Sequence, residues 1–126
     1  TSEADLVAAM QTAAAHCRPG GVAVFAPDWV RETFAAGTDD GGGDAGGRAL
    51  RYLEWTHDPD PADCTYVVDY AILLRDESGA TRVVHDRHVE GLFARATWLR
   101  LLAEAGFEPS VVIDPWKRDL FVCRRL

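Results

Sequence analysis

The sequence has few cysteines, a single lysine and no long hydrophobic run. Its three cysteines, Cys17, Cys64 and Cys123, lie far apart and form no CxxC pair, so neither a zinc ribbon nor a disulfide framework is indicated. Each cysteine lies in an apolar stretch, where a buried free thiol is the ordinary finding. We therefore predict three buried free thiols and a reducing, cytoplasmic location.

The apolar runs are too short to span a bilayer, and we expect no targeting leader, because the chain does not open on a charged-then-apolar pattern. The net charge is −7, with acidic residues spread along the whole length. A field of this sign repels phosphate backbones, so we predict neither a membrane nor a nucleic acid as partner. The 126 residues, 48% of them hydrophobic, suit one globular domain.

The first residues predict an amphipathic helix over 3–17, because apolar residues recur there at helical intervals. Ser2 and Asp5 have the spacing of a capping box. Pro19 ends this helix, and Gly20 supplies the left-handed residue that closes it.

The apolar run Val22–Phe25 follows at once, without alternating polar residues. Such a run is typical of a strand buried on both faces, between parallel neighbours in a sheet covered by helices. We therefore predict an α/β fold in which this strand needs parallel partners.

Residues 37–47 hold six glycines and three aspartates. A phosphate cradle is one interpretation, but no helix follows the stretch, no Lys, Ser or Thr closes it, and its own charge is negative. A flexible surface loop is the favoured prediction.

The rest of the chain alternates between strand and helix patterns. Three strand-like segments joined by short turns predict an antiparallel three-strand meander, at 48–57, 64–74 and 81–93. Helical spacing then returns around Trp98 and ends at Gly106. Two closing strands, 110–116 and 119–125, are close enough to pair as a hairpin.

Three stretches resemble class I S-adenosylmethionine-dependent methyltransferases, and they occur in the family's order. CRPGGVAVF (17–25) resembles the L-x-P-G-G turn and fifth strand, and GLFARATWLRLLAEAGFEPSVV (91–112) resembles the late helix, A-G-F turn and strand. DLFVCRR (119–125) resembles the final, reversed strand. The inserted sheet, 48–93, resembles the substrate-covering sheet of small-molecule methyltransferases, including those that methylate amino sugars.

This resemblance implies a fold: the C-terminal part of a Rossmann-like methyltransferase sheet, with an inserted antiparallel meander, over residues 1–126 as a single domain. It implies methyl transfer from S-adenosylmethionine to a nitrogen or oxygen of a small-molecule acceptor. In the family a glycine-rich loop and an acidic residue of the N-terminal half hold the cofactor, and no strand, glycine loop and helix in this order occur here. We therefore expect a substrate-side part, starting after the fourth strand, that is inactive alone.

The resemblance implies that the fourth strand of the family's sheet, the usual neighbour of the run Val22–Phe25, lies outside this sequence. The run Val22–Phe25 would expose an unpaired apolar edge, which a second copy in a homodimer, a partner chain or the missing N-terminal half would cover. The alternatives to a methyltransferase part are a non-enzymatic module that binds a ligand or dimerises, and one half of a split enzyme.

Asp28 and Trp29 are predicted to contact substrate. They follow the strand at its carboxyl end, where open α/β sheets place their ligand crevice. Asp28 equally fits a cap on a helical turn within 28–36, and both interpretations stay open.

The sequence HDRH at 85–88 suggests a metal site, but strand alternation places His85 and His88 on opposite faces, where they cannot share an ion. Asp86 and His88 share a face. A carboxylate beside an imidazole raises its basicity, so this pair is a candidate general base, or else a surface contact.

Asp69 stands alone on an apolar strand face and is predicted to contact substrate, with Arg51 or Arg87 as a structural partner instead. Tyr52 and Trp55 are predicted to wall an acceptor pocket, or to belong to the core. Three further polar residues are interpreted as surface residues without a role: Arg31, His57 and Arg95.

Overall fold

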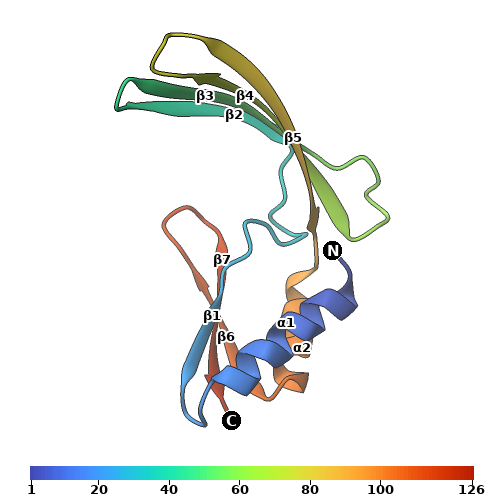
Figure 1. Cartoon of the computed structure of the whole chain (residues 1–126). Coiled ribbons are helices and arrows are strands. Elements are labelled where there is room, and N and C mark those ends of the chain that lie inside the picture. Colours follow the sequence, from blue (N-terminus) through green and yellow to red (C-terminus); the bar gives the residue numbers. More distant parts are fainter. The chain divides into compact units, whose positions relative to one another are not determined.

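The computed structural model describes all 126 residues, which form two compact units (Figure 1). The terminal unit contains Thr1–Phe34 and Gly91–Leu126, and the sheet unit contains Ala35–Glu90. In chain order the elements are α1 (Glu3–His16), β1 (Val22–Phe25), β2 (Gly37–Ala45), β3 (Arg48–His57), β4 (Thr65–Arg75), β5 (Thr81–Gly91), α2 (Arg95–Glu104), β6 (Phe107–Ile113) and β7 (Asp119–Arg125). Neither helix is long and apolar enough to cross a membrane.

The capping box of α1 is confirmed. The Asp5 N–H donates to Ser2 Oγ over 3.1 Å, and the Ser2 N–H donates to the Asp5 carboxylate over 2.9 Å. The bond from the Ser2 N–H, followed by one from the N-terminal ammonium group, holds the pKa of Asp5 far below its ordinary value. After the helix, Gly20 has φ +76°, the left-handed conformation that the sequence predicts.

Strand β1 corrects the central prediction about this fold. Its only partner is β7, which runs antiparallel, in a sheet of order β1-β7-β6. Val22 and Val24 are 62% and 58% exposed, so the predicted burial on both faces between parallel neighbours is wrong. The apolar run has a different cause: Phe25 packs between Trp98 and Phe107, while the two valines lie on the uncovered face.

Two other predictions for this sheet are confirmed. Because β1 and β6 both pair antiparallel with β7, they run in the same direction, with β7 reversed between them. Strand β1 has no partner on its other side, which is the predicted unpaired edge. Strands β6 and β7 form the predicted hairpin, although β6 covers 107–113 rather than the predicted 110–116.

The core of the terminal unit lies between α2 and this sheet. Phe121 is fully buried and stacks on Trp98 with 5.0 Å between ring centroids. Beside it, Arg95 makes a bidentate ion pair with Asp119, at 2.7 and 3.1 Å, and Asp119 is 2% exposed. Arg95 is therefore a partner of a buried carboxylate, rather than a surface residue without a role.

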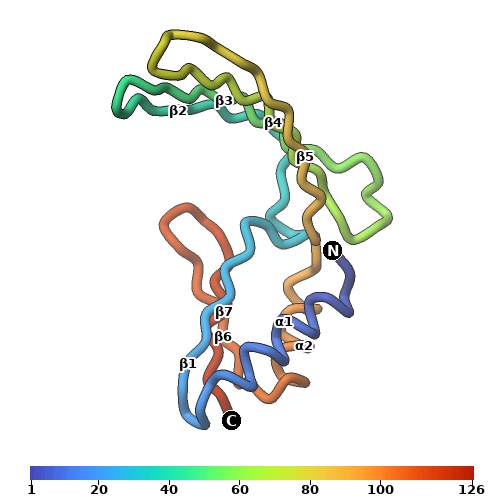
Figure 2. The backbone as a smooth tube through the Cα atoms, in the orientation of Figure 1, coloured from blue at the N-terminus to red at the C-terminus, as the bar shows by residue number.

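The sheet unit contains the predicted meander as β3, β4 and β5, but it has a fourth strand (Figure 2). The prediction of a flexible loop at 37–47 is wrong, because Gly37–Ala45 pairs along its whole length with β3 as strand β2. Glycine permits this close pairing: a Cβ on Gly41 would lie 2.8 Å from the Tyr52 hydroxyl, and one on Gly42 would clash with the Leu50 carbonyl oxygen.

The three cysteines are free thiols, as predicted, but only one is fully buried. Burial raises the pKa of Cys123 to about 11. Cys17 and Cys64 are half-buried, which corrects the prediction of three buried thiols.

Candidate functional site

The four-stranded sheet sorts the predicted site residues onto two faces. In the register of β3 and β4, Trp55 lies opposite Asp69, whereas Tyr52 lies opposite Ile72 on the other face. We call the first the Asp69 face and the second the His88 face. Side chains on opposite faces of one sheet cannot line one pocket, so the predicted residues form two separate clusters.

On the Asp69 face, one carboxylate joins three cationic or ionisable groups. Asp69 accepts from His57 Nε2 over 3.1 Å and from His85 Nε2 over 3.2 Å, and Arg87 lies at 3.8 Å. The hydrogen bond from His57, supported by the charge of Arg87, holds the pKa of Asp69 below its ordinary value despite the opposing effect of burial. Trp55 stacks on the His57 ring with 4.4 Å between centroids.

This cluster confirms Arg87 as a partner of Asp69 but not Arg51, which pairs with Asp44 at 2.8 Å instead. It also corrects the interpretation of His57 as a surface residue, because the Asp69 and His57 side chains are only 18% and 22% exposed. The alternation of Trp55 and His57 already placed them on one face. The missing signal was the register of β3 against β4.

On the His88 face, Asp86 Oδ2 lies 3.1 Å from His88 Nε2, and the Tyr70 ring packs 5.5 Å from the imidazole. The bonds from His88 and from the Arg87 N–H lower the pKa of Asp86. In the tautomer that Asp86 favours, His88 Nε2 carries the proton and Nδ1 is the basic nitrogen. As predicted, Asp86 and His88 share a face, and His85 lies on the other.

Asp28 and Trp29 lie in the terminal unit, in a cavity of about 640 Å³. The other lining residues are Thr33, Trp116, Lys117 and Arg118. Because β1 and β6 run in the same direction, their carboxyl ends lie at one edge of the sheet, and the turn after β6 meets the segment after β1. Asp28 caps no helix, since residues 31–33 form only a turn, and its carboxylate lies 3.6 Å from Arg118.

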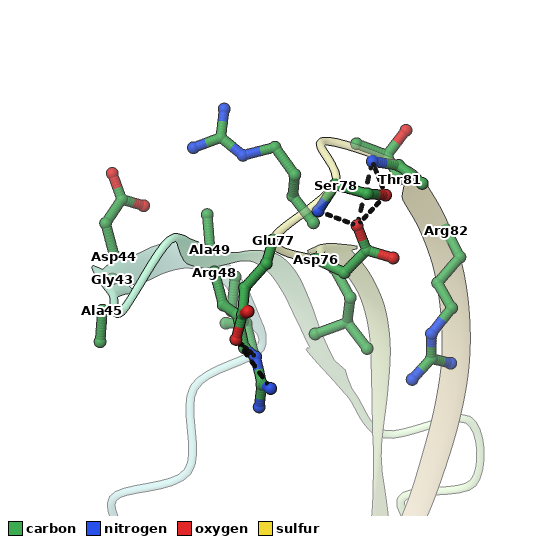
Figure 3. A pocket seen from close by; sticks show the side chains of 14 residues that line it. Gly43, Asp44, Ala45, Arg48, Ala49, Asp76, Glu77, Ser78, Thr81 and Arg82 are labelled. Atoms are coloured by element: carbon green, nitrogen blue, oxygen red, sulfur yellow. Dashed lines mark hydrogen bonds and ion pairs between the residues drawn. The ribbon is translucent and has the colours of Figure 1, made fainter.

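A larger cavity, of about 1000 Å³, lies at the tip of the sheet unit, where the β2–β3 and β4–β5 turns come together (Figure 3). Its polar groups largely bind each other: Arg48 pairs with Glu77 at 2.9 Å, and Asp76 accepts the Ser78 N–H at 2.9 Å. None of the predicted site residues lines it.

The residues of this chain do not form the cofactor cradle that the resemblance implies. Such a cradle needs a glycine-rich loop between a strand and a helix. The glycine-rich stretch here is strand β2, which turns directly into β3 with no helix after it.

No protein-family model matches the chain, and no curated protein matches it. Solved structures do. The sugar N-methyltransferase KedS8 from Streptoalloteichus sp. ATCC 53650 is 29% identical, with a TM-score of 0.83. DesVI from Streptomyces venezuelae is 26% identical, with a TM-score of 0.87. CalS10 from Micromonospora echinaspora, an amino pentose methyltransferase solved with S-adenosylmethionine bound, is 26% identical, with a TM-score of 0.82.

These matches cover 99–100% of this chain but only 50–53% of the three relatives, so the chain spans about half their length. The fold defines the class: the chain matches the C-terminal half of class I S-adenosylmethionine-dependent methyltransferases. Within that class it is similar to small-molecule N-methyltransferases that act on sugars.

Proposed function

We propose that this chain supplies the substrate-side part of an enzyme that transfers a methyl group from S-adenosylmethionine to a nitrogen or oxygen of a small metabolite. The observation that carries the proposal is the match of the whole chain to KedS8, DesVI and CalS10, at TM-scores of 0.82 to 0.87. KedS8 is a sugar N-methyltransferase, and CalS10 is an amino pentose methyltransferase. An amine on a sugar is therefore the favoured acceptor. The free thiols support a cytoplasmic location.

We propose that residues outside this chain hold the methyl donor, because the chain spans only about half the length of KedS8, DesVI and CalS10. What the chain contributes is acceptor positioning and proton removal. We assign to His88 Nδ1 the removal of a proton from the acceptor. The Asp86 carboxylate accepts a hydrogen bond from the other ring nitrogen, Nε2, over 3.1 Å. Tyr52 lies on the same face, with 6.3 Å between its ring centroid and that of Tyr70, and would line the acceptor pocket.

The other predicted contacts divide between the two units. Asp28 and Trp29 are proposed acceptor contacts, because they line a cavity at the carboxyl end of β1. Trp55 and Asp69 lie on the face opposite His88, so they and His88 cannot contact one acceptor molecule on the same side of the sheet. We therefore propose that the His88 face, rather than the Asp69 face, receives the acceptor.

The test is a chimera in which this chain replaces the matching half of DesVI, assayed with labelled S-adenosylmethionine and a panel of amino sugars. His88→Ala is expected to lower kcat by about 10²–10⁴-fold and to remove the acid limb of the pH profile, where protonation of the base stops the reaction. His85→Ala is the matched control, because His85 lies on the same strand, also bonded to an aspartate, but on the other face. The reverse pattern would move the acceptor to the Asp69 face. No transfer by a folded chimera that binds S-adenosylmethionine would refute the function.

One observation favours a second candidate function, a non-enzymatic module that associates through its sheet. The outer edge of β1 is unpaired, and the two valines on its open face are more than half exposed. A second copy of the chain or a separate polypeptide carrying the other half would cover this edge.

A further inference from the structure

Lys117 has an unusual backbone for its residue type. Its φ is +65°, the only positive φ at a residue other than glycine in the described chain. It lies in the five-residue connection between β6 and β7, residues 114–118, in which the Lys117 N–H donates to the Asp114 carbonyl over 2.9 Å. Glycine or asparagine is the preferred residue at this left-handed loop position, so a lysine here costs stability.

The side chain of Lys117 gives a reason to retain it. It lines the cavity of about 640 Å³ with Asp28 and Trp29, and it forms no ion pair in the structure. It is also the only lysine among the 13 basic residues of the chain. Lys117 is exposed, so an ammonium group without a carboxylate partner lies at the wall of this cavity, accessible to a ligand.

The neighbouring cation, Arg118, is already engaged. Its guanidinium donates to Asp114 over 2.8 Å, lies 3.6 Å from Asp28 and stacks on the Trp116 ring at 5.3 Å. Asp114 is buried and also accepts the Trp116 and Arg118 N–H groups, each over 2.9 Å, so it fixes the turn. Lys117 is therefore the free positive charge of this cavity, and Arg118 is part of its wall.

Two tryptophans supply the remaining surface. Trp116 is 75% exposed, and Trp29 lines the cavity while its ring packs on Phe34 at 5.9 Å. Exposed indole faces at the edge of a cavity stabilise the apolar face of a ring compound when it covers them.

We propose that this cavity binds a ring compound that carries a carboxylate or a phosphate, with Lys117 pairing to the anion and the two tryptophans contacting the ring. The proposal goes beyond the proposed function and does not depend on it, because the residues that line this cavity all belong to the terminal unit. Asp28 is 74% exposed in the same cavity and repels an anion, so it limits the affinity.

The experiment uses the 126-residue chain alone, so that it does not depend on methyl transfer. Lysine labelled with ¹³C at Cε gives one signal, because the chain has one lysine. Phenyl phosphate and benzoate are titrated in turn, with benzyl alcohol as the uncharged control and inorganic phosphate as the control without a ring. We expect a saturable shift of the lysine signal with both ring anions, a weaker effect of phosphate, and none with benzyl alcohol.

Variants separate the charge of Lys117 from its backbone. By tryptophan fluorescence, Lys117→Asn, which tolerates the left-handed backbone, weakens phenyl phosphate binding by about tenfold, and Lys117→Arg largely keeps it. Asp28→Asn strengthens it. Lys117→Gly weakens binding as much as Lys117→Asn does and yet raises Tm by about 2–6 °C, because it relieves the backbone strain.

Two results would overturn this proposal while leaving the methyltransferase assignment intact. One is a lysine signal that no anion shifts. The other is preferential binding of benzylamine, lost in Asp28→Asn, which would make Asp28 the charged contact. Conversely, anion binding at Lys117 together with an inactive DesVI chimera would keep the site and refute the enzyme.

Discussion

Asp69 organises side chains from three strands through a single carboxylate. His57 on β3 and His85 on β5 both donate to it, and Arg87 adds a charge at 3.8 Å. A carboxylate with these partners holds neighbouring strands in register, which gives Asp69 a structural role whether or not it meets a ligand. The sequence predicted a substrate contact here because Asp69 is the lone acid on an apolar strand face, and this role stays a prediction.

The lowered pKa of Asp69 predicts how stability depends on pH. Because the pKa lies below its ordinary value of 3.8 in the folded chain, the stabilisation is fully present above that pH and is lost as the pH falls through the folded-state value. Asp69→Asn is therefore expected to lower the urea midpoint at pH 6 and to flatten its decline below pH 4. Equal acid slopes in the variant and the original chain, measured by denaturant titration, would contradict the assignment.

At the scale of elements, the sequence predicted well those features that depend on nearby residues. It predicted poorly which strands pair when the partners lie far apart in the chain. The cap of α1, the glycine after α2 with φ +86° and the β6–β7 hairpin depend on neighbours within a few residues, and each is as predicted. The direction of the partner of β1 and the strand character of β2 depend on residues far away in the sequence. The contact of His57 with Asp69 depends on register, which hydrophobic periodicity does not specify.

The unpaired edge of β1 predicts self-association of the 126-residue chain. An apolar edge strand without a charged residue is a template for pairing with another strand. Val24→Lys places a charge there and is expected to shift the mass measured by light scattering toward the monomer. Leu53→Lys is the matched control, because Leu53 is also about half exposed, at 53%, but lies on β3, which is paired on both sides. A strictly monomeric original chain would remove the basis for this prediction.

At the scale of the whole molecule, the methyltransferase assignment now depends on similarity to solved structures and no longer on strand β1. The sequence interpretation depended on a β1 strand buried between parallel neighbours, and the structure shows an exposed strand with one antiparallel partner. The similarity to half of KedS8, DesVI and CalS10 now carries the assignment. The structure adds that the glycine-rich stretch is strand β2, and that the chain has a cavity and two candidate clusters for an acceptor.

The central claim is a division of labour: this chain handles the acceptor, and other residues hold S-adenosylmethionine. Calorimetric titration of S-adenosylmethionine into the purified 126-residue chain tests it most directly, with CalS10, which was solved with this cofactor bound, as the positive control. The account predicts no heat beyond dilution for the chain and a clear isotherm for CalS10. One-to-one micromolar binding by the chain alone would contradict it.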